Sequence, residues 1–256
     1  MVASPVRFDM VEKTQALIDA MREAAISAYP NEGCGLVVGI GKKTKLITCA
    51  NISTTPAQTF MISPSDYRDA QKAYSILGVW HSHVDESNNP SPADMTGCEA
   101  TDMPWFITSI YGPVSSNPVT DTIMFSPTGY EIDYLGRPYV LGTLDCYSLM
   151  LDYYKREFGV SLTDYARVSE AGTVNYDFFL SQAEHEGFVR QTEVEPKVGD
   201  IFLIQVGSVS PNHIAIYLGG DTILHHMNGR LSKRDIYGGY YQKHTSHHYR
   251  HLKNVD

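Results

Sequence analysis

The chain has 256 residues, 43% of them hydrophobic, and its 29 acidic and 20 basic side chains give a formal net charge of -9. Because typical domains have roughly 100–200 residues, this length predicts one large or two modest domains. The negative charge argues against a dedicated nucleic-acid binder, which needs basic side chains to neutralise phosphates, and against attachment to an anionic membrane surface.

Neither a membrane-spanning segment nor a secretion signal is expected. The longest apolar runs, such as residues 201–204, are far shorter than the ~20 residues that cross a bilayer. Residues 1–15 lack the apolar block of a secretory leader. We therefore expect folding in a reducing cytoplasm, where the cysteines are not expected to form disulfides. The cysteines are Cys34, Cys49, Cys98 and Cys146.

Helices and short strands alternate in the first half of the chain. Apolar residues at helical spacing indicate the helices, and short apolar runs between turn residues indicate the strands. The expected elements are a helix over residues 8–28, strands 36–38 and 45–48, a helix over 63–74 capped by Ser63, and strands 77–81, 107–111 and 122–125.

The second half is expected to form a separate domain. Prolines and glycines between residues 126 and 138 predict the join, and thus domains at 1–135 and 136–256 with an α+β fold. The expected elements are an apolar helix that begins near Cys146, a helical or irregular stretch to about residue 189, and strands 201–205, 213–218 and 222–225. The histidine-rich residues 243–251 predict a polar surface strand or a frayed end, with a second metal site as the alternative.

Two histidines at the end of an apolar strand indicate a metal site. His81 and His83 are two residues apart, so their side chains point to the same face of the strand and can share a zinc ion. Ser91 is a plausible helix cap, which places Asp94 in the first helical turn. Two imidazoles and a carboxylate leave the fourth tetrahedral position open for water, the pattern of a catalytic zinc. Glu32, directly before a strand, could supply the general base.

Each of these pieces also has a simpler interpretation: a polar strand edge, a capping box and a solvated glutamate. Together, at this spacing, they resemble the motif of the JAMM (MPN-type) metalloproteases over about residues 8–130. The resemblance implies an MPN-like mixed sheet with flanking helices. It implies these residue roles: Zn²⁺ binding by His81, His83 and Asp94, general base catalysis by Glu32, and oxyanion stabilisation by Ser91.

A second group of residues suggests a cysteine peptidase. Cys146 opens an apolar helix, whose N-terminal dipole favours the thiolate. A nucleophilic thiol needs a base, and the base needs an orienting group. His213 begins one strand and His225 ends the next, so a hairpin at residues 219–221 would let one histidine orient the other. The simpler interpretation is an inert core cysteine and structural histidines.

This second set resembles the NlpC-type papain-like cell-wall peptidases over about residues 137–250. The matching pieces are Asp145-Cys146-Tyr147-Ser148-Leu149, Gly199-Asp200, Asn212-His213-Ile214-Ala215 and Ile223-Leu224-His225. The resemblance implies a papain-like domain with an antiparallel sheet and peptidoglycan peptide stems as substrate. It implies Cys146 as nucleophile, His213 as base and His225 as third polar residue. The adjacent His226 leaves the choice of third residue open, and Tyr147-Ser148 departs from the usual Ser-Gly.

A JAMM-like half followed by an NlpC-like half resembles the tail tip assembly proteins of long-tailed phages, most specifically over residues 136–149. The resemblance implies two peptidase sites used in tail assembly or cell-wall penetration, with tail tip or baseplate hub proteins as partners. It implies a location in the host cytoplasm during assembly, then the virion tail tip, and the host periplasm on infection, without nucleic-acid binding or membrane insertion. The alternative is a non-catalytic structural tail tip component with vestigial sites, against which the filled motif positions count. A eukaryotic-style deubiquitinase fits poorly with the second half.

Overall fold

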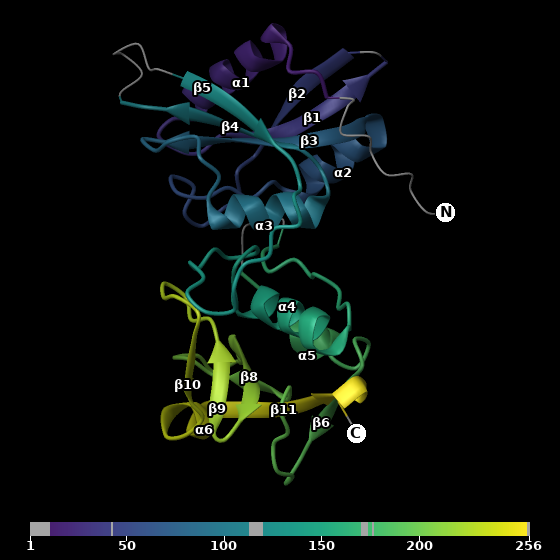
Figure 1. The fold of residues 1–256 in the computed structure, drawn as a ribbon, viewed down its shortest axis with the longest axis vertical. Coiled ribbons are helices and arrows are strands. Elements are labelled where there is room, and N and C mark those ends of the chain that lie inside the picture. Colours follow the sequence, from purple (N-terminus) through teal and green to yellow (C-terminus); the bar gives the residue numbers. More distant parts are fainter. Residues whose placement is uncertain (1–10, 42, 113–119, 170–173, 176, 255–256) are drawn as a thin grey trace. The chain divides into compact units, whose positions relative to one another are not determined.

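The computed structural model describes residues 11–41, 43–112, 120–169, 174–175 and 177–254. Contacts within the chain divide these residues into two compact units, one that ends at Glu131 and one that begins at Ile132. Each unit has its own sheet (Figure 1). The exact division after residue 135 stays a prediction.

The first unit contains a mixed sheet with the strand order β2-β1-β3-β4-β5. Its strands are β1 (Cys34–Ile40), β2 (Lys43–Cys49), β3 (Ser75–Val84), β4 (Trp105–Ile110) and β5 (Thr120–Phe125). Strands β3 and β4 run parallel, and the other neighbouring pairs run antiparallel. The strand with the two histidines, β3, is therefore central, and its residues 77–83 are buried.

Helices cover both faces of this sheet (Figure 1). They are α1 (Gln15–Ala28), α2 (Pro64–Ala73) and α3 (Pro92–Thr101). The apolar side of α1 packs on Trp80 and Phe106. On the opposite face, Cys98 of α3 packs in a cluster with Val79. Because neighbouring residues of a strand face opposite ways, residues 81 and 83 lie on the same face as Val79, the face on which α3 packs.

One helix start differs from the prediction, and one predicted cap makes no side-chain hydrogen bond. The first helix begins at Gln15 rather than residue 8, because Thr14 caps it by accepting a hydrogen bond from the backbone N–H of Leu17. Residues 11–14 are not helical, and residues 8–10 lie outside the described residues. Ser63 does precede α2, but its hydroxyl bonds to Ser65 at 2.6 Å and makes no capping hydrogen bond.

The second unit contains a sheet with the strand order β10-β9-β8-β7-β11-β6, in which neighbouring strands run antiparallel. Its elements are α4 (Cys146–Phe158), α5 (Phe178–Gln182), β6 (Phe188–Gln191), β7 (Ile201–Ile204), β8 (His213–Gly219), β9 (Thr222–His225), β10 (Lys233–Ile236), α6 (Tyr240–His244), β11 (Thr245–His251) and the 3-10 helix η3 (Leu252–Asn254). Residues of α4 such as Leu149 and Met150 pack on Leu203 and Ile214 of the sheet. The predicted α+β fold, a mixed sheet with flanking helices followed by an antiparallel sheet, is confirmed. In the described part of the chain, every helix is too short or too polar to cross a membrane.

The histidine-rich C-terminal segment is not a frayed end. It forms β11, which lies between β7 and β6 inside the sheet. Asp200 holds it there: this buried carboxylate pairs with His248 at 2.7 Å and with two guanidinium nitrogens of Arg250 at 2.8 and 2.7 Å. Because side chains two residues apart in a strand lie on the same face, His248 and Arg250 both reach this carboxylate. The histidines of β11 are not part of a metal-binding group among the described residues.

We expect Asp200→Asn to destabilise the second unit by about 3 kcal/mol, since it leaves Arg250 without its partner. Burial alone raises the pKa of Asp200, but hydrogen bonds from Arg250, His248 and the backbone of Lys197 lower it. A lowered pKa means that this stabilisation is present above about pH 4 and is lost as the pH falls further. Urea unfolding at pH 7 and pH 3 measures both effects. Asp221→Asn, in an exposed turn, is the control, and an equal effect of the two variants would contradict the expectation.

Candidate active sites

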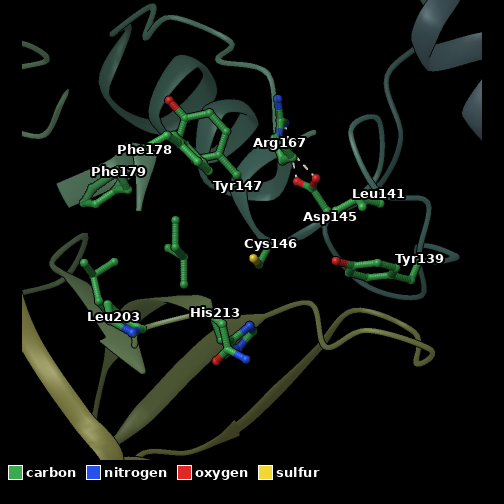
Figure 2. A pocket seen from close by; sticks show the side chains of 13 residues that line it. Tyr139, Leu141, Asp145, Cys146, Tyr147, Arg167, Phe178, Phe179, Leu203 and His213 are labelled. Carbon is green, nitrogen blue, oxygen red and sulfur yellow. Dashed lines mark hydrogen bonds and ion pairs between the residues drawn. The ribbon is translucent and has the colours of Figure 1, made fainter. Parts of the chain in front are cut away.

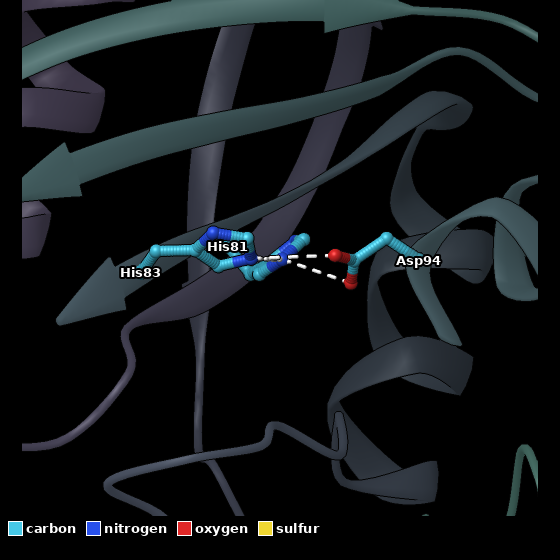
Figure 3. Close-up of side chains that lie close together, drawn as sticks. All are labelled: His81, His83 and Asp94. Atoms are coloured by element: carbon cyan, nitrogen blue, oxygen red, sulfur yellow. Dashed lines mark hydrogen bonds and ion pairs between the residues drawn. The ribbon is translucent and has the colours of Figure 1, made fainter. Parts of the chain in front are cut away.

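The two histidines of β3 meet a carboxylate from α3. His81 and His83 lie on the face of β3 that carries Val79 and on which α3 packs, and Asp94 is in the first turn of α3. The Nε2 atoms of the two histidines are 3.1 Å apart. The carboxylate oxygens of Asp94 lie 3.1 Å from Nε2 of His81 and 3.3 Å from Nε2 of His83 (Figure 3). All three side chains are buried, so the structure brings the predicted ligands together.

Asp94 also takes part in a capping box. Its carboxylate accepts a hydrogen bond from the backbone N–H of Ser91 at 2.7 Å, while the Ser91 hydroxyl accepts one from the backbone N–H of Asp94 at 3.2 Å. The capping interpretation of this motif is therefore confirmed, and the same carboxylate also contacts the two histidines. The cap fixes the carboxylate in the orientation that faces the histidines. The Ser91 hydroxyl accepts the capping bond and keeps its own proton for donation.

The neighbours of the histidines orient their rings. Nδ1 of His83 lies 2.6 Å from the carbonyl oxygen of Ser87, so Nδ1 carries a proton and Nε2 is the nitrogen turned toward Asp94. The His81 ring stacks on Phe60, with centroids 4.4 Å apart, and lies against the edge of Trp105. Both Nε2 atoms are thus held toward the carboxylate.

The three side chains fit a zinc ion. Tetrahedral ligand atoms bonded to zinc at about 2.0–2.2 Å lie about 3.3–3.6 Å from one another, and the separations of 3.1, 3.1 and 3.3 Å are at or just below the lower end of that range. Burial lowers the pKa of His81, which favours the neutral imidazole that binds metal. Burial opposes ionisation of Asp94, but His81, His83 and Ser91 lower its pKa below the usual range. Among the described residues, this is the one cluster of its kind.

Glu32 lies in the loop before β1 and is buried, with 7% of its surface exposed. Burial raises the pKa of its carboxyl to about 8; the nearby charge of His83 opposes this increase, and that of Asp94 adds to it. The carboxyl therefore exchanges a proton near neutral pH, as general acid–base catalysis requires. Ser82, between the two histidines, fixes this loop by accepting a hydrogen bond from the backbone N–H of Gly33 at 2.8 Å.

In the second unit, Cys146 is the first residue of α4 and lines a pocket with His213 (Figure 2). Asp145 caps the helix, since its carboxylate accepts a hydrogen bond from the backbone N–H of Ser148 at 2.9 Å. Asp145 also forms a buried ion pair with Arg167 at 3.1 Å. The Cys146 side chain points from the start of α4 toward the strand that carries His213.

The hairpin of β8 and β9 joins the two predicted histidines. Nε2 of His213 lies 3.0 Å from Nδ1 of His225, and both rings are buried. The neighbouring His226 instead packs edge-on against Tyr139, with ring centroids 5.1 Å apart. The contact with His213 therefore belongs to His225. Since Nε2 of His213 faces His225, its Nδ1 remains for the thiol.

Burial opposes the thiolate form of Cys146 that the helix dipole favours. Burial, with the charge of Asp145, raises the pKa of the Cys146 thiol to about 12. Burial lowers the pKa of His213 to about 3 and that of His225 to about 4. The helix dipole is thus outweighed by the loss of solvation. The pair is a neutral thiol beside a neutral imidazole.

Sequence reasoning missed residues that support these sites. Ser82 was visible between the two histidines, but its role depends on the neighbouring loop. Arg167 and Asp235 are not part of any local sequence motif. Arg167 pairs with Asp145, the cap of α4, and Asp235 lies 3.7 Å from His225. Only pairing between distant segments reveals them.

Comparisons with known proteins agree with this geometry. Residues 14–121 match the family described as prokaryotic homologs of the JAB domain, and residues 136–250 match the NlpC/P60 family. The chain is 36% identical to tail tip assembly protein K of Escherichia phage N15, over 90% of this chain and 92% of that protein. The chain belongs to the tail tip assembly protein K family. The resemblance predicted from the motifs is confirmed.

A second member of the tail tip assembly protein K family, from Escherichia phage lambda, is 28% identical over 74% of this chain and 89% of its own length. Similarity to solved structures is low. The crystal structure of a JAB1/MPN domain protein from Archaeoglobus fulgidus covers 46% of this chain and 91% of its own, with 22% identity and a TM-score of 0.28. The assignment to the protein K family rests on the sequence matches.

Proposed function

We propose that this chain is a phage tail tip peptidase with two separate catalytic centres: a JAMM-type zinc centre in the first unit and a Cys-His-His centre in the second that cuts peptidoglycan peptide stems. The observation that carries the proposal is that each unit brings together a complete set of catalytic residue types from segments distant in sequence. In the first unit, ligands from β3 and α3 converge near a buried glutamate. In the second, a helix N-terminal cysteine shares a pocket with a histidine pair.

In the first unit, His81, His83 and Asp94 would hold Zn²⁺, which lowers the pKa of a bound water and polarises the scissile carbonyl. Glu32 would accept the proton of the nucleophile and pass it to the leaving amine, a role that its raised pKa suits. The Ser91 hydroxyl, whose proton is not used by the cap, would donate to the developing oxyanion.

In the second unit, Nδ1 of His213 would remove the proton from the Cys146 thiol as the sulfur attacks the peptide carbonyl carbon. The amine leaves with that proton and a thioester remains on Cys146. Water then attacks the thioester with Nδ1 of His213 again as base; the carbon–sulfur bond breaks, the proton returns from His213 to the sulfur of Cys146, and the carboxylic acid product is released. A neutral thiol and a neutral imidazole fit this order of steps, since the proton moves only when a substrate is in place.

The setting follows from the family. Relatives of this chain are named tail tip assembly proteins. We place the chain among the tail tip and hub proteins in the host cytoplasm during assembly, and then at the virion tail tip, from which the cysteine centre reaches periplasmic peptidoglycan on infection. A structural component with vestigial sites is the alternative that the experiment below tests.

A crossed inhibition experiment separates the two centres. We expect a zinc chelator to abolish cleavage by the first centre and leave the release of peptidoglycan fragments unchanged. A thiol-alkylating reagent should do the reverse, because Cys146 is the cysteine that shares a pocket with a histidine. Purified peptidoglycan and purified tail tip proteins are the two substrates, and mass spectrometry of the products is the measurement. If both treatments leave every activity unchanged, or if the untreated protein has no activity, the structural alternative is favoured.

A further inference from the structure

A carboxylate lies behind the histidine pair of the second unit. Nδ1 of His225 faces His213 at 3.0 Å, and the other ring nitrogen, Nε2, lies 3.7 Å from a carboxylate oxygen of Asp235. A distance of 3.7 Å is longer than a hydrogen bond but within the range of an ion pair. Cys146, His213, His225 and Asp235 therefore follow one another from α4 across β8 and β9 to β10.

The positions of the protons make this order significant. For Nδ1 of His213 to act as a base, its proton must be on Nε2, which then donates to Nδ1 of His225. His225 must in turn carry its proton on Nε2, the nitrogen that faces Asp235. A carboxylate at this place favours that tautomer of His225, and through it the reactive tautomer of His213.

Asp235 is held in this position by its neighbours. Its carboxylate accepts a hydrogen bond from the Tyr241 hydroxyl at 3.1 Å and pairs with Lys233 at 2.8 Å. These contacts lower the pKa of Asp235, so it is charged. Tyr241 also lies edge-on to the His225 ring, with centroids 5.0 Å apart. One residue thus fixes both the carboxylate and the imidazole.

The charged and titratable groups around His225 come from each neighbouring element. They are His213 on β8, His226 beside it, Lys233 and Asp235 on β10, and Tyr241 on α6. Of these, Asp235 is the one anion, and it favours the protonated imidazole, whereas Lys233 opposes it. The attraction grows when His213 takes the thiol proton, because the histidine pair then carries a positive charge.

We propose that Asp235 is a positioning residue that selects the tautomer of His225 and stabilises the positive charge formed on the histidine pair during thiol attack. The inference rests on the proposed cysteine centre. It extends the predicted Cys146-His213-His225 site by a fourth member that no motif indicates.

The test measures the thiol and the tautomer directly, without peptidoglycan. Iodoacetamide labelling of Cys146 is followed by peptide mass spectrometry from pH 5 to 9, and nitrogen NMR of the full chain reports which ring nitrogen of His225 is protonated. We expect Asp235→Asn to slow labelling about tenfold at pH 7 and to move the His225 proton away from Nε2. Asp235→Glu should restore part of the rate. Asp221→Asn, an exposed aspartate of the β8–β9 turn, should behave as wild type.

A variant that removes the opposite charge sharpens the test. Lys233→Met removes the cation that opposes protonation of His225, so it should speed labelling at pH 7, whereas Asp235→Asn should slow it. Labelling within twofold of wild type in Asp235→Asn, or slower labelling with an unchanged tautomer, would overturn the proposal. Absence of peptidoglycan cleavage by the wild type would instead contradict the proposed function and leave the labelling result valid.

Discussion

Replacing Cys146 with alanine should reduce the release of peptide-stem fragments from purified peptidoglycan by at least about 1,000-fold. The thiol is the one nucleophile in the pocket that faces the histidine pair, so a water molecule would have to replace it without the covalent step. The substitution removes one sulfur atom from a helix N-terminus whose cap is made by Asp145, so folding should be preserved. Mass spectrometry of the soluble fragments, compared between wild type and variant, is the measurement.

The matched control is Cys49→Ala, which removes a half-buried cysteine from β2 of the first unit. It should release the same fragments as wild type at the same rate. Fragments of unchanged identity and rate from Cys146→Ala would show that the second unit does not use this thiol. If even the wild type releases none, tail proteins become the substrates to examine, and the zinc centre becomes the primary activity.

The double substitution of His81 and His83 by alanine should lower bound zinc from about one ion per chain to none. It removes two of the three donor atoms that lie 3.1 to 3.3 Å apart, and the carboxylate of Asp94 alone holds zinc weakly. Zinc added to the wild type at a hundredfold excess over its Kd should raise the Tm of the first unit by about 5–10 °C, an effect absent in the variant. Elemental analysis and calorimetry measure the two results.

Two further variants give the zinc experiment its controls. His247→Ala removes a partly buried histidine of β11 and should leave the zinc content unchanged, since that side chain is outside the metal cluster. Glu32→Gln should keep the zinc and lose the cleavage activity, because Glu32 is placed as base and not as ligand. The zinc centre would be refuted by a wild type that contains no zinc as purified and takes up none on reconstitution.

Local chemistry in the sequence determined most of the elements and indicated the three candidate metal ligands. Strand alternation places His81 and His83 on one face whatever surrounds the strand, and the capping box at Ser91 sets the first turn of a helix from four consecutive residues. The β8–β9 hairpin is equally local, since the turn at residues 219–221 dictates that His213 and His225 lie close together. In each case the interacting groups are near in sequence, so the geometry depends little on the rest of the chain.

The tertiary structure decided what depends on distant segments. It placed Glu32 near the candidate ligands through the pairing of β1 with β3. It also placed the C-terminal histidine segment inside the sheet, where Asp200 offers that segment a charged partner. It set the ionisation of the Cys146 thiol, where burial outweighs the helix dipole that the sequence alone suggested. Solvation and long-range pairing are properties of the folded chain, so neither they nor the carboxylate behind His225 could be derived from spacing in the sequence.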